Sequence, residues 1–103
     1  MIEILDGAMG SEFIKRGFFL PNHIWSAKMN LEAQEIVHQI HSDYVKAGSN
    51  YLTTNTFRTT PRAYAKTGLS LSDATLIAET SLKNAIKIAK NVSTYFGTRT
   101  RQT

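Results

Sequence analysis

The stretch that decides the fold is LEAQEIVHQIHSDYVKAGSNYLTTNTF, residues 31–57. Apolar residues recur at i, i+3 and i+4 over its first half, as they do in an amphipathic helix. They are Ala33, Ile36, Val37, Ile40, Tyr44 and Ala47. Gly48 ends this pattern, and Tyr51–Phe57 is rich in the β-branched and aromatic residues that favour strands. The stretch therefore predicts a helix over residues 31–47, capped by Asn30, that leads into a strand.

Upstream of this unit, the chain opens with another short apolar run. Ile2–Leu5 predicts a strand that is ended by an Asp-Gly turn. Ser11 is then the expected N-cap of a short helix over Glu12–Arg16, and Gly17 suits the position after its end. An irregular stretch containing Trp25 follows.

Downstream, two further helices are predicted. Thr60-Pro61 opens the first, which Gly68 ends. Ser70 or Ser72 begins the second, in a capping-box pattern with Asp73 in place of glutamate. The second helix carries an apolar stripe made of Ala74, Ile77, Ala78, Leu82, Ala85, Ile86 and Ala89. Val92–Phe96 is predicted as a brief third strand, and residues 97–103 as a polar, frayed end.

The order strand, helix, strand, helix is the signature of parallel βαβ units, so the fold class is α/β. Strands Ile2–Leu5 and Tyr51–Phe57 are expected to pair in parallel. A chain of 103 residues suffices for one small domain. Two or three strands leave a parallel sheet with a bare edge, which is typical of the beginning of a larger fold.

Composition narrows the class of protein. Hydrophobic residues make up 42% of the chain and charged residues 19%, which is an ordinary globular balance. There is no cysteine, which excludes disulfides and thiolate zinc ligands on this chain. No apolar run approaches the ~18 residues that span a membrane. The N-terminus has no basic residue before Lys15, unlike a secretory or transit signal, so we expect a cytoplasmic protein.

The charge is unevenly distributed along the chain. Residues 1–57 hold six acidic and four basic residues, whereas residues 58–103 hold two acidic and eight basic ones. A basic second half can indicate nucleic-acid binding. However, the basic residues form no run, and aromatic residues are not interleaved with them as on a stacking surface. Nucleic-acid binding is therefore the weaker alternative.

Two polar clusters lie where parallel α/β folds bind ligands, at the carboxyl ends of the strands. After the first strand, Asp6 can hold a ligand ammonium, and Gly7 allows close backbone approach. At the end of the second strand, Thr54, Asn55 and Thr56 can hydrogen-bond a carboxylate or an amine. Each cluster also has a purely structural interpretation, because Asp-Gly is a common turn and threonine-rich strands are ordinary.

The histidines are weaker candidates. His38 and His41 lie at i, i+3 on the predicted helix, a spacing that can share a metal, but no third ligand accompanies them. They are better interpreted as surface or half-buried packing residues. Trp25, taken alone, is more typical of a local packing anchor than of a ligand contact.

Taken together, four segments resemble a known family. They are LDGAMGSE at residues 5–12, IWSAK at 24–28, HSDYVKAGSN at 41–50 and LTTNTF at 52–57, followed by TP. In this order and at this spacing they resemble the N-terminal stretch of homocysteine S-methyltransferases, from about Ile4 to about Ala89. The IWSAK segment is closer to enzymes that use S-methylmethionine or S-adenosylmethionine than to the betaine or cobalamin branches.

The resemblance implies a (βα)₈ barrel with a zinc ion held by three cysteines. In the family, the zinc binds homocysteine as a thiolate, which attacks the methyl group of the donor and yields methionine. The residues that match the family's substrate-binding positions are Asp6, Gly7, Trp25, Thr54, Asn55 and Thr56. Asp6 matches the carboxylate that contacts the homocysteine amino group, and Thr54 matches a strand-two residue at the homocysteine site.

The departures from the family pattern are equally informative. The chain corresponds to two or three of the eight βα units, and the zinc ligands are absent from it. Residues 1–91 are therefore predicted to be the N-terminal part of a homocysteine-binding barrel domain, and 92–103 a divergent tail. The zinc belongs to the full-length family, and this chain alone is predicted to be inactive.

Two interpretations of the chain remain open besides the nucleic-acid alternative. It is a fragment of a methyltransferase, or it is a non-catalytic truncated isoform that acts through association. An open barrel would leave apolar helix faces in water, so self-association is expected. The faces in question carry Ile36, Ile40, Ile77 and Leu82.

Overall fold

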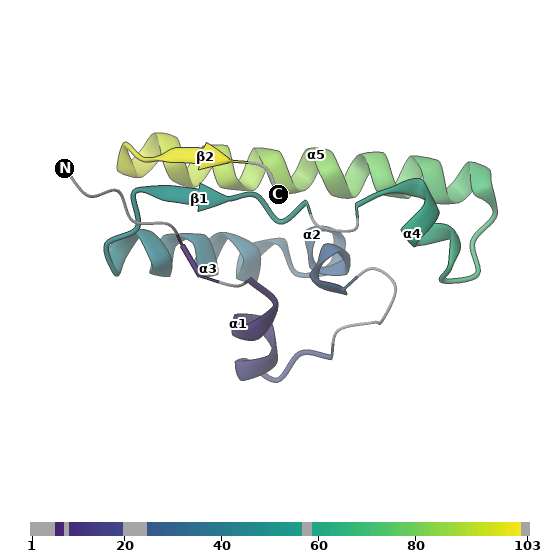
Figure 1. The fold of residues 1–103 in the computed structure, drawn as a ribbon, viewed down its shortest axis with the longest axis horizontal. Coiled ribbons are helices and arrows are strands. Elements are labelled where there is room, and N and C mark those ends of the chain that lie inside the picture. The colour runs from purple at the N-terminus through teal and green to yellow at the C-terminus, as the bar shows by residue number, and fades with distance from the viewer. Residues whose placement is uncertain (1–5, 8, 20–24, 57–58, 102–103) are drawn as a thin grey trace.

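The structure, a computed structural model, describes residues 6–7, 9–19, 25–56 and 59–101 (Figure 1). In chain order the elements are α1 (Met9–Lys15), the 3₁₀ helix η1 (Trp25–Lys28), α2 (Met29–Glu32), α3 (Gln34–Lys46), β1 (Tyr51–Thr53), α4 (Pro61–Ala65), α5 (Leu71–Phe96) and β2 (Arg99–Arg101). The two long helices, α3 and α5, pack against each other, and both contact β1. Within these ranges no helix combines the length and the apolar character that a bilayer span requires.

The sheet consists of β1 and β2, which pair in parallel with Leu52 opposite Thr100 (Figure 1). The Thr54 N–H donates to the Arg101 carbonyl at 2.8 Å and extends the ladder beyond β1. The crossover between the strands contains α4 and α5, as a parallel connection requires. The α/β class is thus confirmed, whereas the strand predicted over Ile2–Leu5, and with it the predicted pairing with Tyr51–Phe57, lies outside the described residues.

The helix predicted over residues 31–47 is divided in two. Ala33 has φ −141° and ψ 51°, so the backbone leaves the helical conformation between α2 and α3. Asn30 is not an N-cap but lies inside α2 with its side chain fully buried. Ser11 likewise lies inside α1, which begins two residues earlier at Met9. Both predictions of a cap were wrong, because a capping residue type alone does not fix where a helix begins.

The predicted starts of α4 and α5 are confirmed by their caps. The Thr60 hydroxyl accepts from the Ala63 N–H, and the Ser70 hydroxyl accepts from the Asp73 N–H, both at 3.2 Å. Gly97, with φ 72°, ends α5 in the left-handed conformation that glycine adopts most easily.

The prediction of a strand over Val92–Phe96 was wrong. These residues are the last turns of α5, because its buried stripe continues through Val92, which is 1% exposed. The third strand is instead β2, which occupies part of the segment expected to be frayed. The boundary expected at residue 91 therefore falls inside a continuous helix.

The core has two clusters, which include residues from different stretches of α5. One contains Phe13, Met29, Val37, Ile40 and Ile88, and the other contains Ala27, Tyr64, Ala74 and Ala78. Ile40 is fully buried, contrary to the expectation that it would stay partly in water. Ile36, Ile77 and Leu82 are half-buried, as expected for faces that the chain covers incompletely.

Candidate functional site

Asp6 lies at the carboxyl end of β1. Its Oδ2 accepts a hydrogen bond from the Thr53 N–H at 2.9 Å, which ties the start of the chain to the last residue of the strand. Its Oδ1 is buried and has no partner among the described residues. Burial raises the pKa of Asp6, and the bonds from Thr53 and the charge of Arg101 oppose this rise. One carboxylate oxygen is thus fixed and the other is left to accept from a ligand.

Gly7 follows Asp6 at a point of close approach to α3. A Cβ on this residue would lie 2.6 Å from the Tyr44 hydroxyl oxygen, closer than real contacts allow. Any side chain here would displace the Tyr44 ring. Glycine therefore lets the backbone beside Asp6 pass over α3.

The segment after β1 turns away from the strand geometry that the sequence predicts. β1 ends at Thr53, and although the Thr54 N–H still bonds to Arg101, the residues after it form local bonds. The Thr56 N–H donates to the Thr54 carbonyl at 2.8 Å, and the two hydroxyl oxygens lie 3.0 Å apart. The Thr59 hydroxyl donates to the Thr56 carbonyl at 2.7 Å. The structure thus brings Asp6 and Thr54 to the same end of β1.

Asn55 faces a protein partner. Its Nδ2 donates to Asn30 Oδ1 at 3.0 Å, and Asn30 Nδ2 donates back to the Asn55 carbonyl at 2.8 Å. Asn30 is fully buried and Asn55 is 3% exposed. This role of Asn30 was not predicted from the sequence. Its position between the apolar residues Met29 and Leu31 was the available signal of burial.

Ser81, on α5, joins this pair to two other elements. Its Oγ donates to the Ala27 carbonyl at 2.9 Å and accepts from Asn30 Nδ2 at 3.2 Å and from the Tyr64 hydroxyl at 2.9 Å. Asn84 Nδ2 donates to the Asn30 carbonyl at 3.0 Å. We call Asn30, Asn55, Tyr64 and Ser81 the Ser81 network.

Trp25 begins η1, two residues before Ala27. Its backbone is therefore close in sequence to the carbonyl that Ser81 holds. The predicted contact of the Trp25 side chain with a pocket lies outside what the structure describes.

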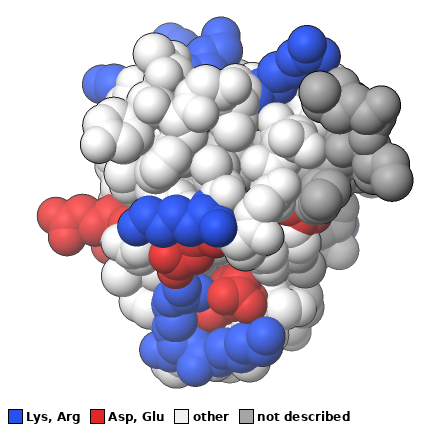
Figure 2. Space-filling model, turned by 90° about the vertical axis from the view of Figure 1, so that its left-hand side faces the viewer, with Lys and Arg blue, Asp and Glu red and all other residues white. Residues whose placement is uncertain are grey.

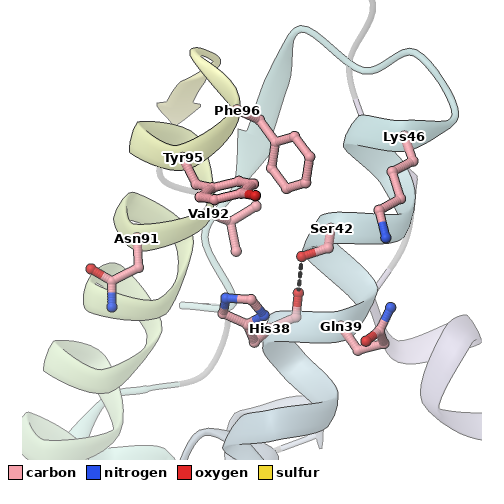
Figure 3. Close-up of a pocket in the computed structure, with 8 residues that line it drawn as sticks. All are labelled: His38, Gln39, Ser42, Lys46, Asn91, Val92, Tyr95 and Phe96. Atoms are coloured by element: carbon pink, nitrogen blue, oxygen red, sulfur yellow. Dashed lines mark hydrogen bonds between the residues drawn. The ribbon is translucent and has the colours of Figure 1, made fainter.

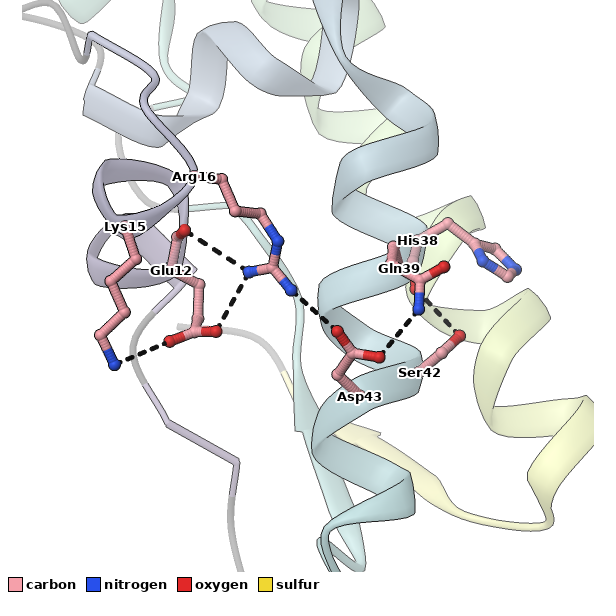
Figure 4. A network of polar contacts seen from close by, with 7 residues as sticks. All are labelled: Glu12, Lys15, Arg16, His38, Gln39, Ser42 and Asp43. Atoms are coloured by element: carbon pink, nitrogen blue, oxygen red, sulfur yellow. Dashed lines mark hydrogen bonds and ion pairs between the residues drawn. The ribbon is translucent and has the colours of Figure 1, made fainter.

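Polar contacts also hold α1 against α3 (Figure 4). The Arg16 guanidinium donates to Glu12 Oε1 at 3.0 Å and to Asp43 Oδ2 at 2.8 Å. Gln39 Nε2 donates to the other Asp43 oxygen at 2.8 Å. These contacts position the helix that follows the Asp6-Gly7 loop, and they are accessible to solvent.

His38 and His41 both lie on α3. A cleft of about 350 Å³ between α3 and α5 is lined by His38, Ser42, Lys46 and Tyr95, near the residues that precede both strands (Figure 3). His41 is fully buried beside this face, and burial lowers its pKa to about 4. Packing is thus its role, and the described residues contain no group of three histidine or acidic side chains that could hold a metal.

Comparison with known proteins places the chain in a family. The sequence pattern described as "Homocysteine S-methyltransferase" matches residues 3–101. Homocysteine S-methyltransferase YbgG of Bacillus subtilis is 37% identical over 82 residues, which cover 80% of this chain and 26% of that protein. Homocysteine S-methyltransferase of Escherichia coli is 35% identical over 86 residues, covering 84% of this chain and 28% of that protein.

The structural comparison agrees. The fold is similar to the metallated crystal structure of the homocysteine methyltransferase MmuM from Escherichia coli, with a TM-score of 0.73 and 30% identity. This match covers 98% of the chain and 36% of MmuM. The chain thus spans about a quarter of the length of the curated relatives that it matches. Since the family pattern covers almost all 103 residues, the chain belongs to the homocysteine S-methyltransferase family.

Proposed function

We propose that this chain forms the homocysteine-binding edge of a homocysteine S-methyltransferase, as the first βα units of a (βα)₈ barrel. The observation that carries the proposal is the Asp6 carboxylate. Thr53 holds one of its oxygens, and the other is buried without a partner among the described residues. A buried carboxylate in this state gains most from a cationic ligand group, such as the ammonium of an amino acid.

The proposed roles follow from position. Asp6 binds the homocysteine ammonium, and the backbone at Gly7 lies beside it. Thr54 and Thr56, whose hydroxyl groups bond to each other, form the wall of the site at the same end of β1, and Trp25 borders the pocket. The Asn55 side chain bonds to Asn30, so we assign it to holding this segment and not to touching the substrate.

The proposed reaction of the whole protein is transfer of a methyl group to the sulfur of homocysteine, which gives methionine. The donor is a sulfonium compound of the S-methylmethionine or S-adenosylmethionine type, and the compartment is the cytoplasm. The zinc that the family implies does not fit the residues at hand, because the chain has no cysteine. Residues outside these 103 would have to hold it, and we derive no step through it here.

We also propose that the isolated chain self-associates through its incompletely covered helix faces. Leu71 and Leu76 on α5 are 70% and 63% exposed, and Ile77 beside them is half-buried. Apolar surface of this kind favours association. The nucleic-acid alternative receives less support, because acidic and basic side chains are mixed across the lower half of the face in Figure 2.

The test of the proposed function is a titration of the chain with homocysteine, followed by NMR. We expect shifts of the Thr53 and Thr54 amide signals. Asp6→Asn removes the charged partner of the ammonium, which costs ~2–5 kcal/mol and weakens binding by roughly 30-fold or more.

Asp43→Asn is the matched control, since Asp43 is an exposed acid in an ion pair far along α3. It should leave binding unchanged. An analogue of homocysteine without the amino group should bind the unmodified chain and the Asp6→Asn variant equally. Equal homocysteine binding by both proteins would show that Asp6 is only a turn residue.

A further inference from the structure

We infer that Ser81 is a positioning residue that fixes the Trp25 turn and the Thr54–Thr56 segment relative to each other. The inference rests on the proposed function, because these two segments carry most of the proposed substrate-binding residues. Ser81 itself lies on α5, behind both segments, and is fully buried. It therefore acts through its hydrogen-bond partners.

The first connection runs to the Trp25 turn. The Ser81 hydroxyl donates to the Ala27 carbonyl at 2.9 Å. Ala27 is fully buried and lies in η1, two residues after Trp25. This bond, together with the packing of Ala27 in one cluster with Ala74 and Ala78, sets where the short helix sits on α5.

The second connection runs to the segment after β1. Asn30 Nδ2 donates both to Ser81 Oγ at 3.2 Å and to the Asn55 carbonyl at 2.8 Å. The reciprocal bond from Asn55 Nδ2 to Asn30 Oδ1 fixes the amide plane of Asn30. Because Thr54 and Thr56 flank Asn55, the bonds between Asn55 and Asn30 also fix the positions of the two threonines.

Tyr64 is the third hydrogen-bond partner of the Ser81 hydroxyl. The Tyr64 hydroxyl donates to Ser81 Oγ at 2.9 Å. A serine hydroxyl offers one donor and two acceptor positions, and Ala27, Asn30 and Tyr64 occupy all three. A satisfied buried network of this kind specifies one arrangement of the elements that it joins.

Ser93 provides an internal comparison on the same helix. It is also buried, at 7% exposure, but its hydroxyl has no hydrogen-bond partner among the described residues. Ser93→Ala and Ser81→Ala therefore remove the same atom from similar surroundings, and they differ in the bonds that are lost.

The experiment is amide hydrogen exchange by NMR on the full 103-residue chain, under conditions where each variant is native. In Ser81→Ala we expect exchange to accelerate about tenfold or more at residues 27–29 and at Thr56, because unpaired buried groups favour local opening. Amides of Val37 and Ile40 on α3 should keep their rates. Ser93→Ala should change neither set.

A homocysteine titration measures the binding affinity, which a loss of packing alone should leave unchanged. Ser81→Ala should weaken binding about tenfold, the effect of one lost positioning bond, while Ser93→Ala should bind as the unmodified chain does. If the unmodified chain does not respond to homocysteine, the proposed function fails for this chain, and the exchange comparison still decides the positioning role.

Two results would overturn the inference. One is equal exchange in Ser81→Ala and Ser93→Ala at both segments, and the other is a uniform acceleration that includes α3. If Ser81→Ala does not fold, Tyr64→Phe removes a single bond to Ser81 and should accelerate exchange several-fold at the same two segments. Unchanged exchange in Tyr64→Phe would then count against the inference.

Discussion

The Ser81 network and the region of His41, Ser93 and Thr98 treat buried polar groups in opposite ways. At the carboxyl end of β1, the Ser81 network pairs side chains from α2, α4 and α5 with the segment after the strand. Outside this network, the buried polar atoms of His41, Ser93 and Thr98 have no hydrogen-bond partners among the described residues, and neither does Asp6 Oδ1, which is left for the proposed ammonium. A satisfied network fixes geometry, whereas an unpaired buried group lowers stability. The difference supports the proposal that the carboxyl end of β1 forms a defined site.

The largest expected effect on stability comes from breaking the Ser81 network at Asn30. Asn30→Leu leaves the Asn55 carbonyl and amide without their partner in a buried position, which should lower the free energy of unfolding by about 4 kcal/mol. Denaturant unfolding measures this loss. Asn91→Leu, at an exposed position on α5, is the control and should change stability little. A loss below ~1 kcal/mol for Asn30→Leu would show that the network contributes little.

The next effect is a dependence of stability on pH, which arises from the buried and unpaired His41. Burial lowers the pKa of His41 to about 4, below the ~6.5 of an unfolded histidine. Between these values the unfolded state binds the extra proton, so stability falls as the pH decreases. The loss between pH 7 and pH 4 should be about 3 kcal/mol.

His41→Leu isolates this contribution. The variant should lose that part of the pH dependence. Its free energy of unfolding should therefore rise relative to that of the unmodified chain as the pH is lowered. Unfolding curves at several pH values check this. Parallel pH profiles for the two proteins would contradict a neutral, buried His41.

A smaller effect is expected at Gly7, where the loop beside Asp6 passes over α3. Gly7→Ala places a methyl group against Tyr44 and should cost about 1–2 kcal/mol, as overpacking does when a side chain must move. Combining Gly7→Ala with Tyr44→Leu should remove most of this cost, which a double-mutant cycle measures. Additive losses would mean that the two residues do not meet.

The sequence predicted the helices and strands best where one local rule decides them. The helices α4 and α5 begin where the sequence predicts, because the side-chain oxygens of Thr60 and Ser70 each accept from a free N–H of the first turn. The prediction failed at Val92–Phe96, where β-branched and aromatic residues suggested a strand. There, packing of Val92 on the core extends α5 and overrides the local preference.

The candidate site was predicted in part. The carboxyl-end rule identified Asp6 and Thr54, which the structure brings to one end of β1. The partners behind them were missed, because Asn30, Ser81 and Asn55 meet only across 25 to 51 residues of sequence. Asn30 resembled a cap and Ser81 an ordinary helix residue. Periodicity carries no information about such distant polar pairs.

The smallest expected effect is that of the exposed contacts between α1 and α3. Arg16→Ala removes ion pairs with Glu12 and Asp43, whose side chains are 24% and 44% exposed. Exposed pairs contribute little, so the loss should be ~0.5 kcal/mol at low salt and should vanish near 1 M salt, where the screening length is ~3 Å. Arg62→Ala, at an exposed position on α4, is the matched control and should show no salt-dependent difference. If Arg16→Ala costs as much as Asn30→Leu, the position of α1 depends on surface charge, and the contrast between a buried network and its exposed neighbours fails.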